Sequence, residues 1–328
     1  MSNRNNADQL QSGQELFKVI EVVDSEAWNN LVRSSDAGTI FHTTLWQDYS
    51  PHTFIRFGVY QGDRLLAGAV VEVDEFGAGK VKSVSPYTGP VIASGLSSEE
   101  QRRAVSLLAT SLKRIPQVKF YTSPWFQTLQ PFVLERFNVQ LFYTAVLPLE
   151  DADVAWSRFM PSLRRNISRA ESDGYSVERT TDPATLLTLV SKTFSRQGRA
   201  VWFDLKEAQD CMDMLGRQGL ACCFVTYNSA AEPVAACGIV WDWRRSYYIL
   251  GGYDEVRSHR GGSSMALWHA IRYTCTELEL REFDLEGSHI PTIERFFRQF
   301  GGEIIPFYSV TGPAVRQVPE AIGSSTNL

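Results

Sequence analysis

The 328-residue sequence predicts a mixed α/β protein built from two similar halves, over residues 17–150 and 151–328, after a polar tail over residues 1–16. Three observations support this fold class. The chain is long enough for two domains and a sizeable core. Strand and helix patterns alternate along its length. Both halves follow one order of strand, two helices, paired strands, a further strand, helix, strand, helix and strand, without a visible residue-level repeat.

In the first half, Asp24 and Ser25 are typical helix caps, so a helix should follow them through Trp28. Gln61-Gly62-Asp63 is a strong turn signal between two strands. The other expected elements are strands at Phe17–Val23, Thr53–Tyr60, Arg64–Val73, Lys80–Ser85, Val118–Thr122 and Gln140–Leu149, with a capped amphipathic helix at Ser97–Ile115.

The second half begins with a helix that Pro161 should kink or restart. Its most informative stretch is the aromatic, β-branched strand Ser246–Tyr253, which contains a glycine pair and leads through a basic glycine loop into a helix. The other expected elements are strands at Tyr175–Arg179, Ala221–Tyr227, Pro233–Trp243, Phe283–Ser288 and Glu303–Val310, and helices at Pro183–Arg196, Leu205–Gln218, Met265–Leu278 and Ile293–Phe300.

Composition excludes several classes of function. The net charge of −5 and the absence of a long basic run argue against duplex nucleic acid as a partner. No apolar run approaches the roughly 18–20 residues that cross a membrane, and no signal peptide opens the chain. Five cysteines without a Cys-x-x-Cys pair predict buried, reduced thiols. We therefore expect a cytoplasmic protein that acts on a small molecule; the sequence does not indicate its oligomeric state.

The loop Arg260-Gly261-Gly262-Ser263 directly precedes a helix. Free N–H groups and the helix dipole favour an anion at such a position. An ordinary Gly/Ser helix start is the alternative, and the loop alone does not decide between them.

The order of parts is more specific than the loop. Strand, basic glycine loop, helix, the strand with Asp284-Leu285-Glu286-Gly287, helix, Phe300-Gly301-Gly302 and strand together resemble the C-terminal half of GNAT acyltransferases. The chain is most similar to the branch with the Fem-type peptidyltransferases and related double-GNAT acyltransferases, over about residues 17–310. The resemblance implies two GNAT-like halves packed side by side, acyl-CoA as co-substrate, and its pyrophosphate on Arg260, Gly261, Gly262 and Ser263.

The resemblance also implies a site on neighbouring strands. In GNAT enzymes the equivalent of the Leu250-Gly251 strand end bulges and offers backbone N–H groups to the thioester, although glycine is common at any strand end. Asp284 and Glu286 should share one face of a central strand, where a buried carboxyl could accept a proton from an amine. Salt bridges to nearby arginines are the alternative. His259 is a weaker candidate base, and no metal-ligand spacing occurs.

The acceptor is expected in a cleft between the halves. Aromatic side chains could stack on a base or sugar, and small arginine clusters suit a diphosphate. The candidates are Phe41, Trp46, Tyr87, Trp125, Trp202, Tyr253, Arg164, Arg165, Arg196 and Arg199. Core packing of the aromatics and surface ion pairs of the arginines are the alternatives.

Related acyltransferases act on nucleotide-linked amino sugars in surface-polysaccharide synthesis, so the resemblance favours acyl transfer to an amino-sugar nucleotide. Two other functions stay open. One is a Fem-type transferase that uses charged tRNA on a cell-wall precursor, which the lack of a helical hairpin insertion makes less favoured. The other is a catalytically silent double-GNAT binding protein.

Overall fold

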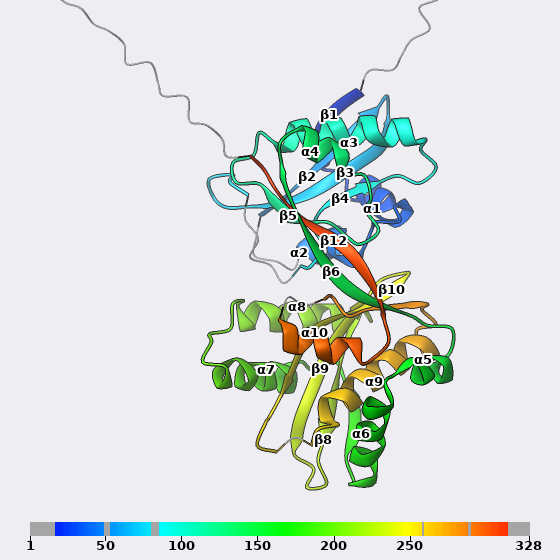
Figure 1. Ribbon diagram of the computed structural model, residues 1–328. Coiled ribbons are helices and arrows are strands. Elements are labelled where there is room, and N and C mark those ends of the chain that lie inside the picture. The colour runs from blue at the N-terminus through cyan, green and yellow to red at the C-terminus, as the bar shows by residue number, and fades with distance from the viewer. Residues whose placement is uncertain (1–16, 49–52, 80–84, 258, 288–289, 314–328) are drawn as a thin grey trace, which may run out of the picture.

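The computed structural model describes residues 17–48, 53–79, 85–257, 259–287 and 290–313. Within these ranges the chain forms two sheets with helices packed against them, which confirms the mixed α/β class (Figure 1). The expected polar tail over residues 1–16 and most of the strand expected over Lys80–Ser85 lie outside the described residues.

The first sheet has the order β1-β2-β3-β4 and is antiparallel throughout. Helices α1 and α3 cover its opposite faces, α1 through Trp28 and α3 through Leu108. Asp24 caps α1, and Ser97 forms a capping box with Glu100 at α3, as the sequence predicts. The elements of this region are β1 (Phe17–Glu21), α1 (Ser25–Ser34), η1 (Ile40–His42), α2 (Thr44–Asp48), β2 (Thr53–Gln61), β3 (Arg64–Val73), β4 (Pro90–Ile92), α3 (Ser98–Leu112) and α4 (Gln130–Leu134).

The second sheet has the order β5-β12-β6-β11-β10-β9-β8-β7, and only the β10–β11 pair is parallel. Its strands are β5 (Lys119–Tyr121), β6 (Asn138–Pro148), β7 (Ser176–Thr180), β8 (Ala221–Tyr227), β9 (Pro233–Trp241), β10 (Arg245–Tyr253), β11 (Glu282–Asp284) and β12 (Glu303–Thr311).

Helices cover both faces of this second sheet. Helices α5 (Ala152–Arg158), α6 (Pro161–Ser172) and α9 (Gly262–Thr276) pack into a core on one face, which also takes in Phe297 of α10 (Pro291–Arg298). Helices α7 (Ala184–Arg196) and α8 (Leu205–Arg217) pack on the other face. Pro161 occupies the first turn of α6, so it starts a new helix after α5.

The larger sheet continues across the expected boundary between the halves. Strand β12 lies between β5 and β6 and pairs with β6 from Glu303 opposite Val146 to Thr311 opposite Asn138. In Figure 1 these two long strands run together from the upper to the lower part of the molecule. The strand expected to close the first half therefore also belongs to the sheet of the second half, and the boundary near residue 150 stays a prediction.

Two further sequence expectations concern the cysteines and membranes. All five cysteines are free thiols, four of them buried and Cys275 half-buried. Among the described residues, no helix combines the length and the apolar character needed to cross a membrane.

The shared sheet predicts that the halves do not fold separately. We expect fragments 17–150 and 151–313, expressed alone, to lack a cooperative thermal transition, because each leaves long strands unpaired. Co-expression should restore one transition, measured by circular dichroism. Independent cooperative melting of either fragment would contradict this.

Candidate active site

A cavity of about 740 Å³ opens beside β10 and is enclosed by parts of α7, α9, α10 and the segment after β11. It collects many of the residues that the sequence singled out. Those in its lining are Arg196, Trp202, Leu250, Gly251, Tyr253, His259, Arg260, Ser263 and Glu286.

The cavity exists because the sheet splits at this point. Strands β10 and β11 pair only from Arg245 opposite Glu282 to Tyr247 opposite Asp284, where β11 ends. Strand β10 continues along β9 to Tyr253, and its register shifts between Tyr248 and Leu250. This register shift lies next to the strand end where the sequence predicts a bulge, and the β10 backbone beyond it has no β11 partner among the described residues. Backbone groups on the open side of β10 can therefore face a ligand.

Gly251 is required by a close approach of a side chain. A Cβ atom at this position would lie 1.7 Å from the phenol oxygen of Tyr248. The Tyr248 ring itself packs edge-on against Phe297, with 5.3 Å between centroids. Any residue larger than glycine would therefore displace part of the cavity wall.

The loop before α9 provides a basic, uncapped helix start. Gly261 is the N-cap and has no side-chain capping bond. The Gly262 N–H donates to the His259 carbonyl at 2.9 Å, so the N–H groups of Ser263 and Ser264 are those of the first turn that a ligand could use. Arg260 is exposed, lines the cavity and forms no ion pair with the described part of the chain. Gly262 is buried instead, and its carbonyl accepts a hydrogen bond from Thr226 at 2.9 Å. Arg260 and Ser263 are the loop residues that reach the cavity.

His259 uses both ring nitrogens to hold this loop. Nδ1 accepts the Gly261 N–H at 3.0 Å, and Nε2 lies 3.4 Å from Asp173 Oδ2. An accepting Nδ1 places the ring proton on Nε2. This geometry favours a loop-holding role for His259 over the role of a base.

Glu286 is the carboxylate that reaches the cavity. The strand expected over Phe283–Ser288 ends at Asp284, and Glu286 follows in the left-handed region with φ of 56°. Its Oε1 atom is buried and has no hydrogen-bond partner among the described residues. Burial, and then the like charge of Asp284, raise the pKa of Glu286 well above its ordinary value.

Asp284 has a different environment from Glu286, and it does not line the cavity. Its carboxylate is fully buried and accepts hydrogen bonds from the Thr144 hydroxyl at 2.5 Å, the Glu286 N–H at 2.8 Å and the Tyr87 phenol at 2.8 Å. Burial raises the pKa of Asp284, whereas these three hydrogen bonds lower it. Three donors favour the ionised form of Asp284, so Glu286 is the carboxyl of this pair that keeps its proton to the higher pH.

Several expected acceptor contacts lie elsewhere. Phe41, Trp46 and Tyr87 are buried in an edge-on aromatic cluster with Tyr247, at centroid distances from 4.6 to 6.4 Å. Trp125 lies under the guanidinium of Arg245, 3.4 Å from its ring centroid. The remaining expected residues outside the cavity lining are Arg164, Arg165, Arg199, Gly261 and Gly262.

The sequence analysis missed the aromatic wall of the cavity. Tyr248, Phe194, Phe203, Phe296 and Phe297 line it. Four of them lie on helices or loops, where an apolar side chain more often packs in the hydrophobic core than lines a binding site. No local sequence signal therefore identifies them as cavity residues. Tyr248 lies just before the glycine pair, which was the only available indication.

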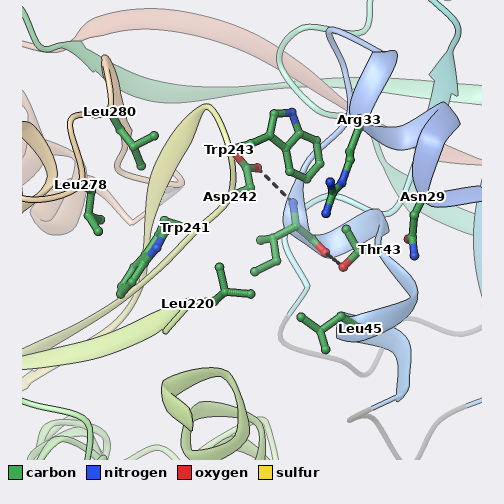
Figure 2. A pocket seen from close by; sticks show the side chains of 11 residues that line it. Asn29, Arg33, Thr43, Leu45, Leu220, Trp241, Asp242, Trp243, Leu278 and Leu280 are labelled. Carbon is green, nitrogen blue, oxygen red and sulfur yellow. Dashed lines mark hydrogen bonds between the residues drawn. The ribbon is translucent and has the colours of Figure 1, made fainter. Parts of the chain in front are cut away.

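A second cavity of about 490 Å³ lies between α1 and the β9–β10 turn (Figure 2). Figure 2 shows Arg33 beside Trp243, and the guanidinium lies 5.8 Å from the ring centroid. The carboxylate of Asp242 is occupied by the N–H of Ile40 at 3.1 Å and by the Tyr247 phenol at 2.8 Å. None of the residues predicted for the site lines this second cavity, whereas nine of them line the cavity beside β10, which is therefore the candidate active site.

One thiol lies in the lining of the candidate site. Cys237 lines the cavity, but burial, followed by Cys223 and Cys222, raises the pKa of its thiol well above the ordinary value. No group of three or more metal-binding side chains occurs in the described ranges.

Comparisons with known proteins agree with this architecture. Residues 157–298 match the family model described as "Acetyltransferase (GNAT) domain". The fold resembles that of FemX, with a TM-score of 0.67 and 14% identity over 89% of this chain and 96% of that chain. A tandem GNAT protein from the clavulanic acid biosynthesis pathway gives a TM-score of 0.55 and 13% identity over 91% of this chain and 99% of that one.

A third similar structure is the C-terminal domain of a putative lysylphosphatidylglycerol synthetase from Agrobacterium fabrum. Its TM-score is 0.55, with 11% identity over 88% of this chain and 91% of that chain. No curated protein matches the sequence.

Residues 157–298 thus match a GNAT domain model in sequence. The chain as a whole has the double-GNAT fold, since FemX and the tandem GNAT protein match it over nearly their full lengths. At 11–14% identity these likenesses define the fold, and the reaction has to be argued from the site.

The buried carboxyl of Glu286 generates a stability prediction. Its pKa is raised by folding, so the stability that it contributes is complete below about pH 4 and is lost as pH rises through the folded-state pKa. Glu286→Gln cannot titrate, so we expect its melting temperature to exceed that of the wild type increasingly with pH. The gain near pH 8 should correspond to about 1 kcal/mol.

Differential scanning fluorimetry from pH 5 to pH 8 tests this expectation. The matched control is Glu255→Gln, because Glu255 lines the same cavity but its side chain is 66% exposed. A constant difference between the Glu286→Gln variant and the wild type across the pH range would contradict the prediction.

Proposed function

We propose that the protein is an acyl-CoA-dependent N-acyltransferase whose active site is the cavity beside β10. One observation carries the proposal. The open edge of β10, the uncapped start of α9 with Arg260, and the buried carboxyl of Glu286 meet in a single cavity of about 740 Å³.

These parts match the needs of acyl transfer to an amine. The amine nitrogen attacks the thioester carbonyl, the C–S bond breaks, CoA leaves as a thiolate, and the proton of the amine moves to Glu286. A backbone N–H on the open side of β10, at Leu250 or Gly251, holds the carbonyl oxygen as it gains negative charge. Glu286 suits the role of base because its raised pKa brings it closer to neutral pH.

The donor's pyrophosphate is assigned to the loop before α9. Arg260 supplies a positive charge without a carboxylate partner in the described chain, and the first turn of α9 supplies N–H groups. Ser263 adds a hydroxyl at the same end of the cavity.

An amino-sugar nucleotide is the proposed acceptor. Trp202 lines the cavity with 66% of its surface exposed, which suits stacking on a base or sugar. Arg196 lies 4.3 Å from the Tyr253 ring centroid and 3.6 Å from Glu255, so its guanidinium is held at the cavity. A diphosphate bound there would replace Glu255 as its partner.

Transfer of an aminoacyl group from charged tRNA to a cell-wall precursor is the second candidate. The fold shared with FemX favours it. The net charge of −5 argues against a polyanionic donor, because tRNA binding normally needs a basic surface.

The donor assignment predicts a specific kinetic defect. Arg260→Ala should raise the Michaelis constant for acyl-CoA by about one to two decades, since a charge-assisted contact is worth roughly 1.5–3 kcal/mol. Arg257→Ala is the matched control, because Arg257 lies in the same loop but pairs with Glu232 at 3.2 Å and is outside the cavity lining. An equal rise of the Michaelis constant for acyl-CoA in both variants would contradict the assignment of the pyrophosphate to Arg260.

The acceptor assignment is tested by product formation. The protein is incubated with several acyl-CoAs and amino-sugar nucleotides, and separately with charged tRNA and a cell-wall precursor, and products are identified by mass spectrometry. We expect transfer to the amino-sugar nucleotide, with a Michaelis constant for this acceptor that rises at least about tenfold in Trp202→Ala. Transfer only from charged tRNA would overturn the choice of acyl-CoA as donor. Transfer from acyl-CoA to simple amines alone would rule out an amino-sugar nucleotide as the acceptor.

A further inference from the structure

We propose that Asp284, Tyr87 and Thr144 form a positioning unit that holds Glu286 in its reactive place, so that the N-terminal half takes part in catalysis without touching the cavity. The proposal rests on the role of Glu286 in the proposed function. None of the three residues lines the cavity.

The unit is a closed set of short, buried hydrogen bonds. Tyr87 donates to Asp284 Oδ2 at 2.8 Å, and Thr144 donates to Oδ1 at 2.5 Å. Asp284 and Tyr87 are completely buried, and Thr144 is 1% exposed. A carboxylate in this setting keeps its charge only because donors surround it.

The third bond connects Asp284 to the backbone of Glu286. Asp284 Oδ1 accepts the Glu286 N–H at 2.8 Å, two residues along the chain, as an aspartate does in an Asx turn. Glu286 needs such support because it is not glycine and yet has φ of 56°. The next residue, Gly287, has φ of 60°, and a Cβ there would lie 2.1 Å from the Tyr143 carbonyl oxygen. The turn that directs Glu286 into the cavity is therefore fixed from both sides.

The same unit sets the charge around Glu286. The negative charge of Asp284 opposes ionisation of its neighbour and, after burial, is the cause that raises the pKa of Glu286. Burial raises the pKa of the Tyr87 and Tyr248 phenols, and the charge of Glu286 raises both further. The other charged or titratable groups of the cavity are Cys237, His259, Arg260, Arg196, Tyr253 and Glu255.

Tyr87 extends the unit into the N-terminal half. It lies just before β4, and its ring is held edge-on by Phe41 at 6.0 Å and by Phe307 at 5.7 Å. A displacement of the N-terminal half would therefore move the phenol that stabilises the Asp284 charge. Tyr247 provides a natural comparison, because its buried phenol donates to a different carboxylate, Asp242 Oδ2, also at 2.8 Å.

The test compares Asp284→Asn, Tyr87→Phe and Thr144→Val with the matched control Tyr247→Phe, and uses Glu286→Gln as the reference for loss of the base. We expect Glu286→Gln to lower turnover by roughly 10²–10⁴-fold. The three unit variants should lower kcat by roughly 10- to 100-fold and leave the Michaelis constant for acyl-CoA within about twofold.

The pH profile separates positioning from simple stability. Without the Asp284 charge the pKa of Glu286 falls, so the acid limb of kcat/KM should move to lower pH in Asp284→Asn, and by a smaller amount in Tyr87→Phe and Thr144→Val. In Tyr247→Phe the acid limb of the kcat/KM profile should stay at the wild-type pH, even if the melting temperature of the variant drops.

A titration without substrates makes the result independent of the enzyme assay. The protein is labelled with [δ-¹³C]glutamate, the Glu286 carboxyl signal is assigned by its loss in Glu286→Gln, and its midpoint is followed by NMR. We expect a midpoint above that of the other glutamates in the wild type, and a lower one in Asp284→Asn. An unchanged midpoint and an unchanged acid limb in Asp284→Asn and Tyr87→Phe would overturn the proposal. If Glu286→Gln keeps normal turnover, the proposed base fails, whereas a shifted carboxyl midpoint would still support the unit.

Discussion

The buried carboxylate of Asp284 receives hydrogen bonds from three segments that are far apart in the sequence: Tyr87 before β4, Thr144 in β6 and the backbone of Glu286 after β11. A buried charge is costly unless it is hydrogen-bonded, and loss of one donor leaves part of that cost uncompensated. The relative placement of these segments is therefore constrained by one side chain. The position of the Glu286 carboxyl in the cavity is a consequence of this constraint.

Strands β10 and β11 are paired at one end and separate toward the other, and the paired end is held by side-chain contacts. Arg245 in β10 forms an ion pair with Glu282 in β11, and its guanidinium also stacks on Trp125. With Arg245 and Glu282 opposite each other in register, the two strands are joined firmly at one end. Strand β11 ends two residues later, at Asp284, so the strands separate over a short distance. A wedge-shaped opening in a stiff sheet follows, and this shape keeps backbone groups exposed without loosening the fold.

Local sequence signals predicted most elements but not their pairing. Caps such as Asp24 and Ser97, and the proline that starts α6, depend on neighbouring residues and are visible in the sequence. The insertion of β12 between β5 and β6 depends on contacts over more than 150 residues, and an alternating pattern fits either sheet equally well. Glu286 was placed on a strand by alternation, whereas a turn with φ of 56° brings it to the cavity. Burial of Phe41, Trp46 and Tyr87 could not be told from exposure in a cleft, because both environments favour aromatic residues.

The place of β12 in the sheet has a consequence for biosynthesis. A ribosome releases β5 and β6 well over a hundred residues before β12, their shared neighbour, so these strands wait with open edges while the intervening chain emerges. Contacts of such high sequence separation slow folding and expose intermediates to aggregation. The smaller antiparallel sheet differs in this respect, because its strands all lie within residues 17–92 and need no partner from later in the chain. The cavity beside β10 is then among the last features to take shape, because its sheet is complete only when β12 arrives.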